Sequence, residues 1–207
     1  MASYAISKVL RIVSGGGPVT KDVYQANSGQ TWKAGSLLKL TSGKLSVCKD
    51  TSGGASILDT TDTGTSGARL FLALCDHPEI DQGTGDIPVV PLGSDFVSVQ
   101  EITDDTFLEA QMCAAGSEAT DGTALVKGGS FALYQLQDTE SSPYKGSGII
   151  GVDIGNTTEA VANVIDVATN YDLYNEGLRN DSDGYPTASP SLNYSKVTFK
   201  ILSAILA

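Results

Sequence analysis

The 207-residue sequence holds one histidine, one tryptophan and three cysteines, and positive charge is scarce. Thirteen lysines and arginines stand against 24 aspartates and glutamates, which gives a formal net charge of −11. Nucleic-acid binding and docking on anionic membranes both draw affinity from clustered basic side chains, and the sequence has no such cluster. No run of 18 apolar residues is present either. We therefore expect no nucleic acid and no membrane among the partners.

The cysteines Cys48, Cys75 and Cys113 are odd in number and far apart, with no Cys-x-x-Cys pair. A disulfide framework or a zinc site normally shows even numbers or close spacing, so we expect three buried or partly buried thiols in a reducing compartment. No cofactor and no metal is expected. The sequence begins without a charged segment followed by a long apolar run, so we expect no secretory signal and synthesis in a cytoplasm.

Small and polar residues fill much of the chain. There are 23 glycines, and charged residues make up 18% of the sequence, against about 25% in an average soluble protein. Short apolar runs recur between turns rich in glycine, serine and threonine. This pattern predicts an all-β fold, an antiparallel β-barrel or sandwich with at most one short helix.

Two strand predictions rest on clear local patterns. Apolar residues alternate over 38–40 and again over 45–47, and Gly43 lies in the four residues between them, so we expect a β-hairpin. The run 68–75 is apolar apart from Arg69 and is bounded by turn residues, which is typical of a strand buried on both faces; the period alone also fits a short helix.

One segment carries mixed signals. Val161, Val164 and Ile165 follow helical spacing, and Asn156 with Glu159 three residues later fits a capping box. The β-branched residues of the same segment favour a strand instead. We interpret it as the one short helix.

Chain organisation is suggested by the run Ser14-Gly15-Gly16-Gly17-Pro18, which can continue neither a strand nor a helix. We predict an N-terminal arm over residues 1–17, tethered by a flexible joint, and a single β-rich domain over residues 18–207. Residues 156–207 either belong to the same barrel or form an extension that projects from it.

Three motifs invite a chemical interpretation. His77 lies in a turn after a buried strand, and we interpret it as a surface histidine. The run Asp62-Thr63-Gly64-Thr65 is similar to the active-site loop of aspartic proteases, but such a site needs a second Asp-Thr-Gly that the sequence lacks. The Asp181–Asp183 loop does not fit an EF-hand and is either a looser calcium loop or an Asp/Gly turn. We expect no catalytic residue and no enzymatic activity.

The segment Trp32-Lys33-Ala34-Gly35-Ser36-Leu37-Leu38-Lys39-Leu40, followed by a Ser-Gly-Lys turn and Leu45-Ser46-Val47-Cys48, resembles the opening hairpin of capsid decoration, or cement, proteins of tailed bacteriophages. Later elements follow the order of that family. They are a small apolar strand over 68–76, the run Ile87-Pro88-Val89-Val90-Pro91-Leu92, and Asp95-Phe96-Val97-Ser98-Val99. The resemblance covers about residues 30–136.

The resemblance implies a β-barrel or β-tulip protein, often a homotrimer, that binds the outer surface of an expanded capsid. Its partner would be the major capsid protein, and its location the capsid exterior of the virion. Apolar anchors on the arm would then make the contacts, and Trp32 would hold either the core or a subunit contact. The candidate contact residues are Tyr4, Ile6, Val9, Ile12 and Trp32.

Two other classes of function stay open from the sequence. The chain could be another virion component, such as a tail-tube, head-completion or head-fibre subunit. It could also be a carbohydrate-binding β-sandwich module, although such modules usually display several exposed aromatic side chains.

Overall fold

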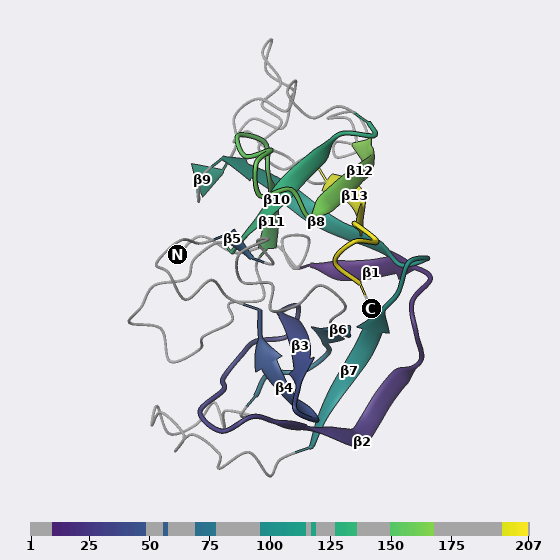
Figure 1. Ribbon diagram of the computed structural model, residues 1–207, viewed down its shortest axis with the longest axis vertical. Helices are drawn as coiled ribbons and strands as arrows, with labels where there is room; N and C mark the ends of the chain where they lie inside the picture. Colours follow the sequence, from purple (N-terminus) through teal and green to yellow (C-terminus); the bar gives the residue numbers. More distant parts are fainter. Residues whose placement is uncertain are drawn as a thin grey trace, which may run out of the picture.

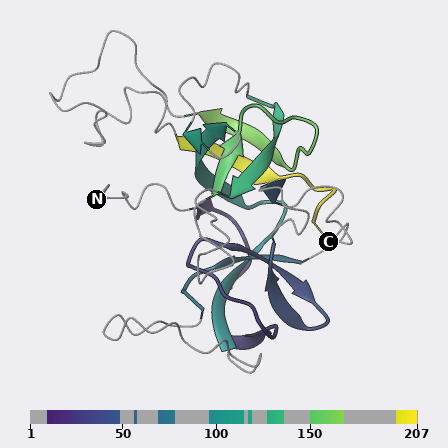
Figure 2. The ribbon, with the colours of Figure 1, turned by 90° about the vertical axis from the view of Figure 1, so that its left-hand side faces the viewer.

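The computed structural model describes residues 10–48, 56–57, 69–77, 96–114, 117–118, 127–135, 150–167 and 196–206. Within these residues the chain forms thirteen strands and no helix, arranged as two barrels stacked along the long axis (Figures 1 and 2). The strands are β1 (Arg11–Ser14), β2 (Val19–Ala26), β3 (Leu37–Thr41), β4 (Lys44–Val47), β5 (Ser56–Ile57), β6 (Leu70–Ala73), β7 (Phe96–Ile102), β8 (Phe107–Ala114), β9 (Ser117–Glu118), β10 (Ser130–Gln135), β11 (Ile150–Asp153), β12 (Ala162–Val167) and β13 (Lys196–Ile201). The predicted all-β barrel class is confirmed.

The first barrel closes through the ring β2-β4-β3-β6-β7. The predicted hairpin forms its wall as β3 and β4, in which Leu38 opposes Val47 and Thr41 opposes Lys44. The two loop residues, Ser42 and Gly43, have φ angles of 50° and 80°. Positive φ at both loop residues matches the right-handed twist of the strands, which explains why a glycine stands at the second position.

Strand β6 confirms the prediction of a strand that is buried on both faces, since all four of its side chains are buried. Phe71 and Ala73 point into the first barrel with Val97 and Val99 of β7. Leu70 and Leu72 point the other way and join the core cluster of the second barrel. A continuous apolar run is therefore required, because each face of this strand meets a separate core.

The second barrel also closes. Strand β8 runs parallel to β11, which pairs with β10; β10 pairs with β12, β12 with β13, and β13 returns to β8. Strand β1 adds to one side of β8, and it lies between the two barrels in Figure 1. The short strands β5 and β9 attach to β10 and β8. Strands β11, β12 and β13 place residues 150–167 and 196–201 in the same barrel as β8.

The predicted helix is wrong, because Ala162–Val167 forms strand β12. The capping signal itself is satisfied. The Asn156 side chain accepts hydrogen bonds from the amides of Thr158 and Glu159, at 3.1 and 3.2 Å, and donates to Glu159 Oε2 at 2.9 Å. These bonds close a single turn, after which β12 pairs with β13 over its β-branched residues. Tertiary pairing thus overrides a local helix-start signal.

The expected flexible joint is also corrected, because Gly15–Gly17 packs tightly against the β7–β8 connection. The Gly17 amide donates to the Glu101 carbonyl at 2.9 Å, and the Gln100 side chain donates to the Gly17 carbonyl at 3.2 Å. A Cβ atom on Gly15 would lie 2.1 Å from the Asp105 carbonyl oxygen. The three glycines are therefore needed for close backbone approach where both connections cross between the barrels.

Candidate functional site

The candidate contact residues lie in different settings. Tyr4, Ile6 and Val9 fall outside the described residues. Ile12 opposes Leu108 on β8 and is half-buried against the larger core cluster. Trp32 is 0% exposed and belongs to the core of the first barrel. Of the two roles considered for Trp32, the structure places it as a core anchor, because a side chain with no exposed surface cannot touch a partner without rearrangement.

His77 is not the surface residue that the sequence suggested, because it is 4% exposed. Its backbone forms a bridge with Trp32, in which each amide donates to the other carbonyl at 2.8 Å. The two rings stack with centroids 4.6 Å apart. The Ala34 amide donates to Asp76 Oδ1 at 2.8 Å and reinforces the same closure. This group seals one end of the first barrel, so His77 acts here as a packing residue.

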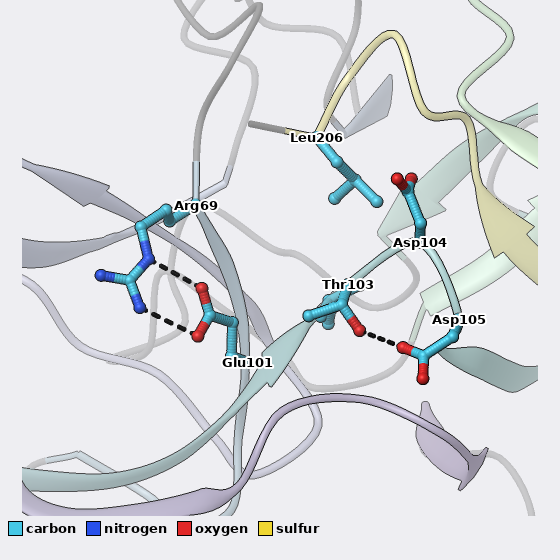
Figure 3. A pocket seen from close by; sticks show the side chains of 7 residues that line it. Arg69, Glu101, Thr103, Asp104, Asp105 and Leu206 are labelled. Carbon is cyan, nitrogen blue, oxygen red and sulfur yellow. Dashed lines mark hydrogen bonds and ion pairs between the residues drawn. The ribbon is translucent and has the colours of Figure 1, made fainter.

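A pocket opens where the two barrels meet, and Figure 3 shows its side chains. Its volume is about 310 Å³, and it is lined by Arg69, Ile102, Leu206 and a run of polar residues from β7 into the β7–β8 turn. On one wall, Arg69 donates two hydrogen bonds to Glu101, at 2.7 and 2.9 Å. This bond pair raises the pKa of Arg69 and lowers the pKa of Glu101.

The opposite wall is the turn between β7 and β8. The Thr103 amide donates to Thr106 Oγ1 at 2.8 Å, and the Thr106 amide donates to the Thr103 carbonyl at 3.0 Å. The Thr103 hydroxyl donates to Asp105 Oδ1, which also accepts the Gly16 amide at 3.4 Å. These two donors lower the pKa of Asp105. The turn is thus held rigidly at the point where the connections cross.

Two of the three carboxylates that line the pocket, Glu101 and Asp105, are engaged by Arg69 and Thr103, and Asp104 is the third; the described lining contains no histidine, cysteine or serine. Among the described residues, no three histidine, cysteine, aspartate or glutamate side chains come together as metal ligands. The Arg69–Glu101 bonds on one wall and the hydrogen bonds of the β7–β8 turn on the other stabilise the junction between the barrels.

Asp62 and the Asp181–Asp183 loop lie outside the described residues. None of the cysteines forms a disulfide; Cys48 and Cys113 are buried and Cys75 is half-buried, as predicted. In the part of the chain that the structure describes, no helix has the length and apolar character needed to cross a membrane.

Strand β1 has a backbone edge that pairs with no other strand among the described residues. It is the end strand of its sheet, and among the described residues it pairs with β8 alone. Arg11 fixes it there by donating from Nε to Glu109 Oε1 at 2.8 Å. Val13, on the same strand, is 44% exposed. An end strand with an open edge can accept a further strand from a partner, with main-chain hydrogen bonds supplying affinity.

Comparisons with known proteins give no relative: no protein-family model, no curated protein and no solved structure matches this chain.

Sequence reasoning missed the ion pairs that build the junction. Arg69 and Glu101 are 32 residues apart in the chain, and Arg11 and Glu109 are 98 apart. No local spacing signals such pairs. The one available signal was the triple glycine, because consecutive glycines often mark a place where another backbone approaches closely.

Proposed function

We propose that this chain is a structural protein of a tailed-bacteriophage virion, which binds the outer surface of the capsid and stabilises contacts between major capsid protein subunits. The observation that carries the proposal is the segment Trp32–Cys48. It resembles the opening hairpin of capsid decoration proteins, and it folds as the hairpin wall of a closed barrel. A barrel of this kind is the fold that the resemblance implies.

Charge and the open edge of β1 support the same role. A net charge of −11 keeps unassembled copies soluble and disfavours contact with packaged DNA. Strand β1 lies within the predicted arm over residues 1–17, which also contains Tyr4, Ile6 and Val9. We propose that the arm and β1 together form the capsid contact, by strand addition combined with apolar anchoring. Copies of the chain would assemble on the shell as homotrimers, as the resemblance implies.

The arm can be tested separately from the barrels. We would compare wild type with the triple variant Tyr4→Ser, Ile6→Ser and Val9→Ser for co-sedimentation with expanded and unexpanded capsid shells of its own phage that lack the protein. Each apolar side chain buried at the contact contributes roughly 1.5–3 kcal/mol. The variant should therefore lose binding by at least a hundredfold, while its unfolding midpoint stays at the wild-type value.

A matched pair of valines tests the role of β1. Val13 on β1 is 44% exposed, and Val23 on β2 is 59% exposed within the closed first barrel. Val13→Asp should weaken shell binding by about tenfold or more through burial of a charge at the contact. Val23→Asp should bind as wild type does. Equal binding by wild type and both Asp variants would remove β1 from the contact.

A further inference from the structure

The two barrels share one ring order. In chain order the first barrel uses β2, β3, β4, β6 and β7, and the second uses β8, β10, β11, β12 and β13. In each ring the first strand lies parallel to the third, and the remaining neighbours, third–second, second–fourth, fourth–fifth and fifth–first, are antiparallel. Many five-stranded ring orders exist, so a shared order with the same single parallel pair already points to a common plan.

The register of the pairing agrees as well. When Gln25 is placed on Gln111, most residue pairs that bond two strands of the first barrel fall on a pair that bonds the matching strands of the second. The exceptions are three pairs at the ends of β3 and β6, and the two pairs of Val19 and Thr20, which lie beyond a bulge in β2. Examples from each ladder are Gln25↔Lys44 with Gln111↔Gly151, Leu40↔Leu45 with Leu133↔Val152, Leu38↔Phe71 with Phe131↔Ala162, Ala73↔Val99 with Val164↔Phe199, and Tyr24↔Val97 with Ala110↔Val197. Outside this bulge the matched strands of the two rings keep the same stagger, which for a barrel sets its shape and interior.

In each barrel, a glycine just before the second strand makes the same backbone contact with the fourth strand. In the first, the Gly35 amide donates to the Ala73 carbonyl at 2.8 Å, and the Ala73 amide donates to the residue after Gly35 at 2.9 Å. In the second, the Gly128 amide donates to the Val164 carbonyl at 2.7 Å, and the Val164 amide donates to the residue after Gly128 at 2.9 Å. Both glycines have positive φ, 90° and 82°. Gly35 and Gly128 are matched by the strand register alone, and not because both are glycines.

The interiors correspond position by position. Apart from Trp32, the side chains packed inside the first barrel all have a counterpart in the core cluster of the second. The pairs are Tyr24 with Ala110, Ala26 with Met112, Leu38 with Phe131, Leu40 with Leu133, Leu45 with Val152, Val47 with Ile154, Phe71 with Ala162, Ala73 with Val164, Val97 with Val197 and Val99 with Phe199.

At two neighbouring interior positions, the larger side chain is on a different strand in each barrel. Phe71 in the first barrel stands where the second has Ala162, while Val99 stands where the second has Phe199. Phe71 and Val99 are diagonal neighbours across β6 and β7, because Phe71 opposes Glu101 and Val99 opposes Ala73. At these two positions each barrel therefore has one phenylalanine, on β6 in the first barrel and on β13 in the second, so the larger side chain at one position partly offsets the smaller one at the other, as close packing requires.

We infer that the chain contains two tandem copies of one five-stranded barrel, residues 19–102 and 107–201, that arose by internal duplication. The crossing of Gly15–Gly17 over the β7–β8 turn lies where the copies join. The inference stands independently of any capsid partner.

The test moves the packing of the second barrel into the first. Phe71→Ala alone should lower the guanidinium unfolding midpoint strongly, and Val99→Phe alone should lower it through overpacking. The double variant Phe71→Ala with Val99→Phe carries the residues of the second barrel at these two positions and should recover at least half of the midpoint lost in Phe71→Ala. If Phe71→Ala does not fold while the double variant does, that rescue supports the same conclusion.

The matched control is Phe71→Ala with Val97→Phe. Val97 and its counterpart Val197 are the same residue, so the duplication gives no reason for a phenylalanine at 97 to fill the space. Rescue by Val97→Phe equal to that by Val99→Phe, or no rescue by Val99→Phe, would overturn the inference. Capsid binding plays no part in this readout, so its outcome is independent of the proposed function.

Discussion

The clearest structural prediction concerns Gly15, where the two connections between the barrels cross. Gly15 has a φ of +71°, and a Cβ there would lie 2.1 Å from the Asp105 carbonyl oxygen and 2.7 Å from its carbon. Contacts this close to backbone cannot be relieved by a side-chain rotation. Gly15→Ala should therefore displace either the glycine run or the β7–β8 turn that the Thr103–Thr106 hydrogen bonds hold.

The magnitude follows from two contributions. A left-handed conformation costs an L-residue roughly 1–2 kcal/mol. Forcing an extra methyl into a packed site costs typically about 1–3 kcal/mol more. Gly43 supplies a matched control, because it has a φ of +80° and nothing within 4 Å of its added Cβ. Gly43→Ala should thus suffer only the cost of the left-handed conformation. Gly15→Ala should be less stable than Gly43→Ala by about 1–3 kcal/mol.

Guanidinium unfolding measures this difference. Fluorescence of Trp32, the only tryptophan, reports the first barrel, and far-ultraviolet circular dichroism reports both barrels. Linear extrapolation of both signals gives the free energy of unfolding of each variant. If Gly15→Ala were no less stable than Gly43→Ala, the crossing would not be packed, and residues 15–17 would act as the flexible joint that the sequence first suggested.

Three further variants probe other parts of the structure. Trp32→Ala should lower the free energy of unfolding by about 3–5 kcal/mol, because it empties the barrel end against His77. Urea titration followed by circular dichroism should show a clearly smaller loss of stability for Trp32→Phe. The pKa of Glu101 is lowered from 4.5 by Arg69, so the stability from this pair is present above that pH and is lost as the pH falls through the lowered value. The stability difference between wild type and Glu101→Gln, under about 1 kcal/mol for so exposed a pair, should therefore shrink in thermal melts between pH 6 and pH 3; a constant difference would contradict the ion pair. Asn156→Ala should cost about 1–2 kcal/mol through the lost turn bonds, with an unchanged far-ultraviolet spectrum, whereas a loss of helical signal would contradict the strand assignment.

Local signals predicted the elements that local chemistry controls. The β3–β4 hairpin depends on two loop residues with positive φ between alternating apolar runs, all within the segment 37–47. The burial of β6 on both faces follows from an uninterrupted apolar run. Both could be predicted because no distant residue is needed to decide them.

The features that the sequence did not show depend on residues that are far away in the chain. The strand β12 depends on β13, some thirty residues later, while the capping bonds of Asn156 were satisfied by a single turn. The burial of His77 depends on Trp32, 45 residues earlier. Gly15 is a glycine because of Asp105, ninety residues away. Each local reading was chemically sound, and each was overridden by a tertiary contact.

The repeat of the barrel stayed hidden for a related reason. The second and third strands are joined by two residues in the first barrel, 42–43, and by residues 136–149 in the second. Unequal connections remove any fixed period from the sequence. Exchanged core volumes, such as Phe71 for Ala162, remove residue identity as well. Only the register of the strands preserves the correspondence.

The proposed role as a capsid-binding protein is tested most directly by cryo-electron microscopy of expanded capsid shells, which lack the protein, after incubation with the purified chain. The account predicts added density for paired barrels at regular positions on the outer surface, with the arm and β1 against the shell. Bare shells, with all of the protein left in solution at saturating concentration, would contradict it.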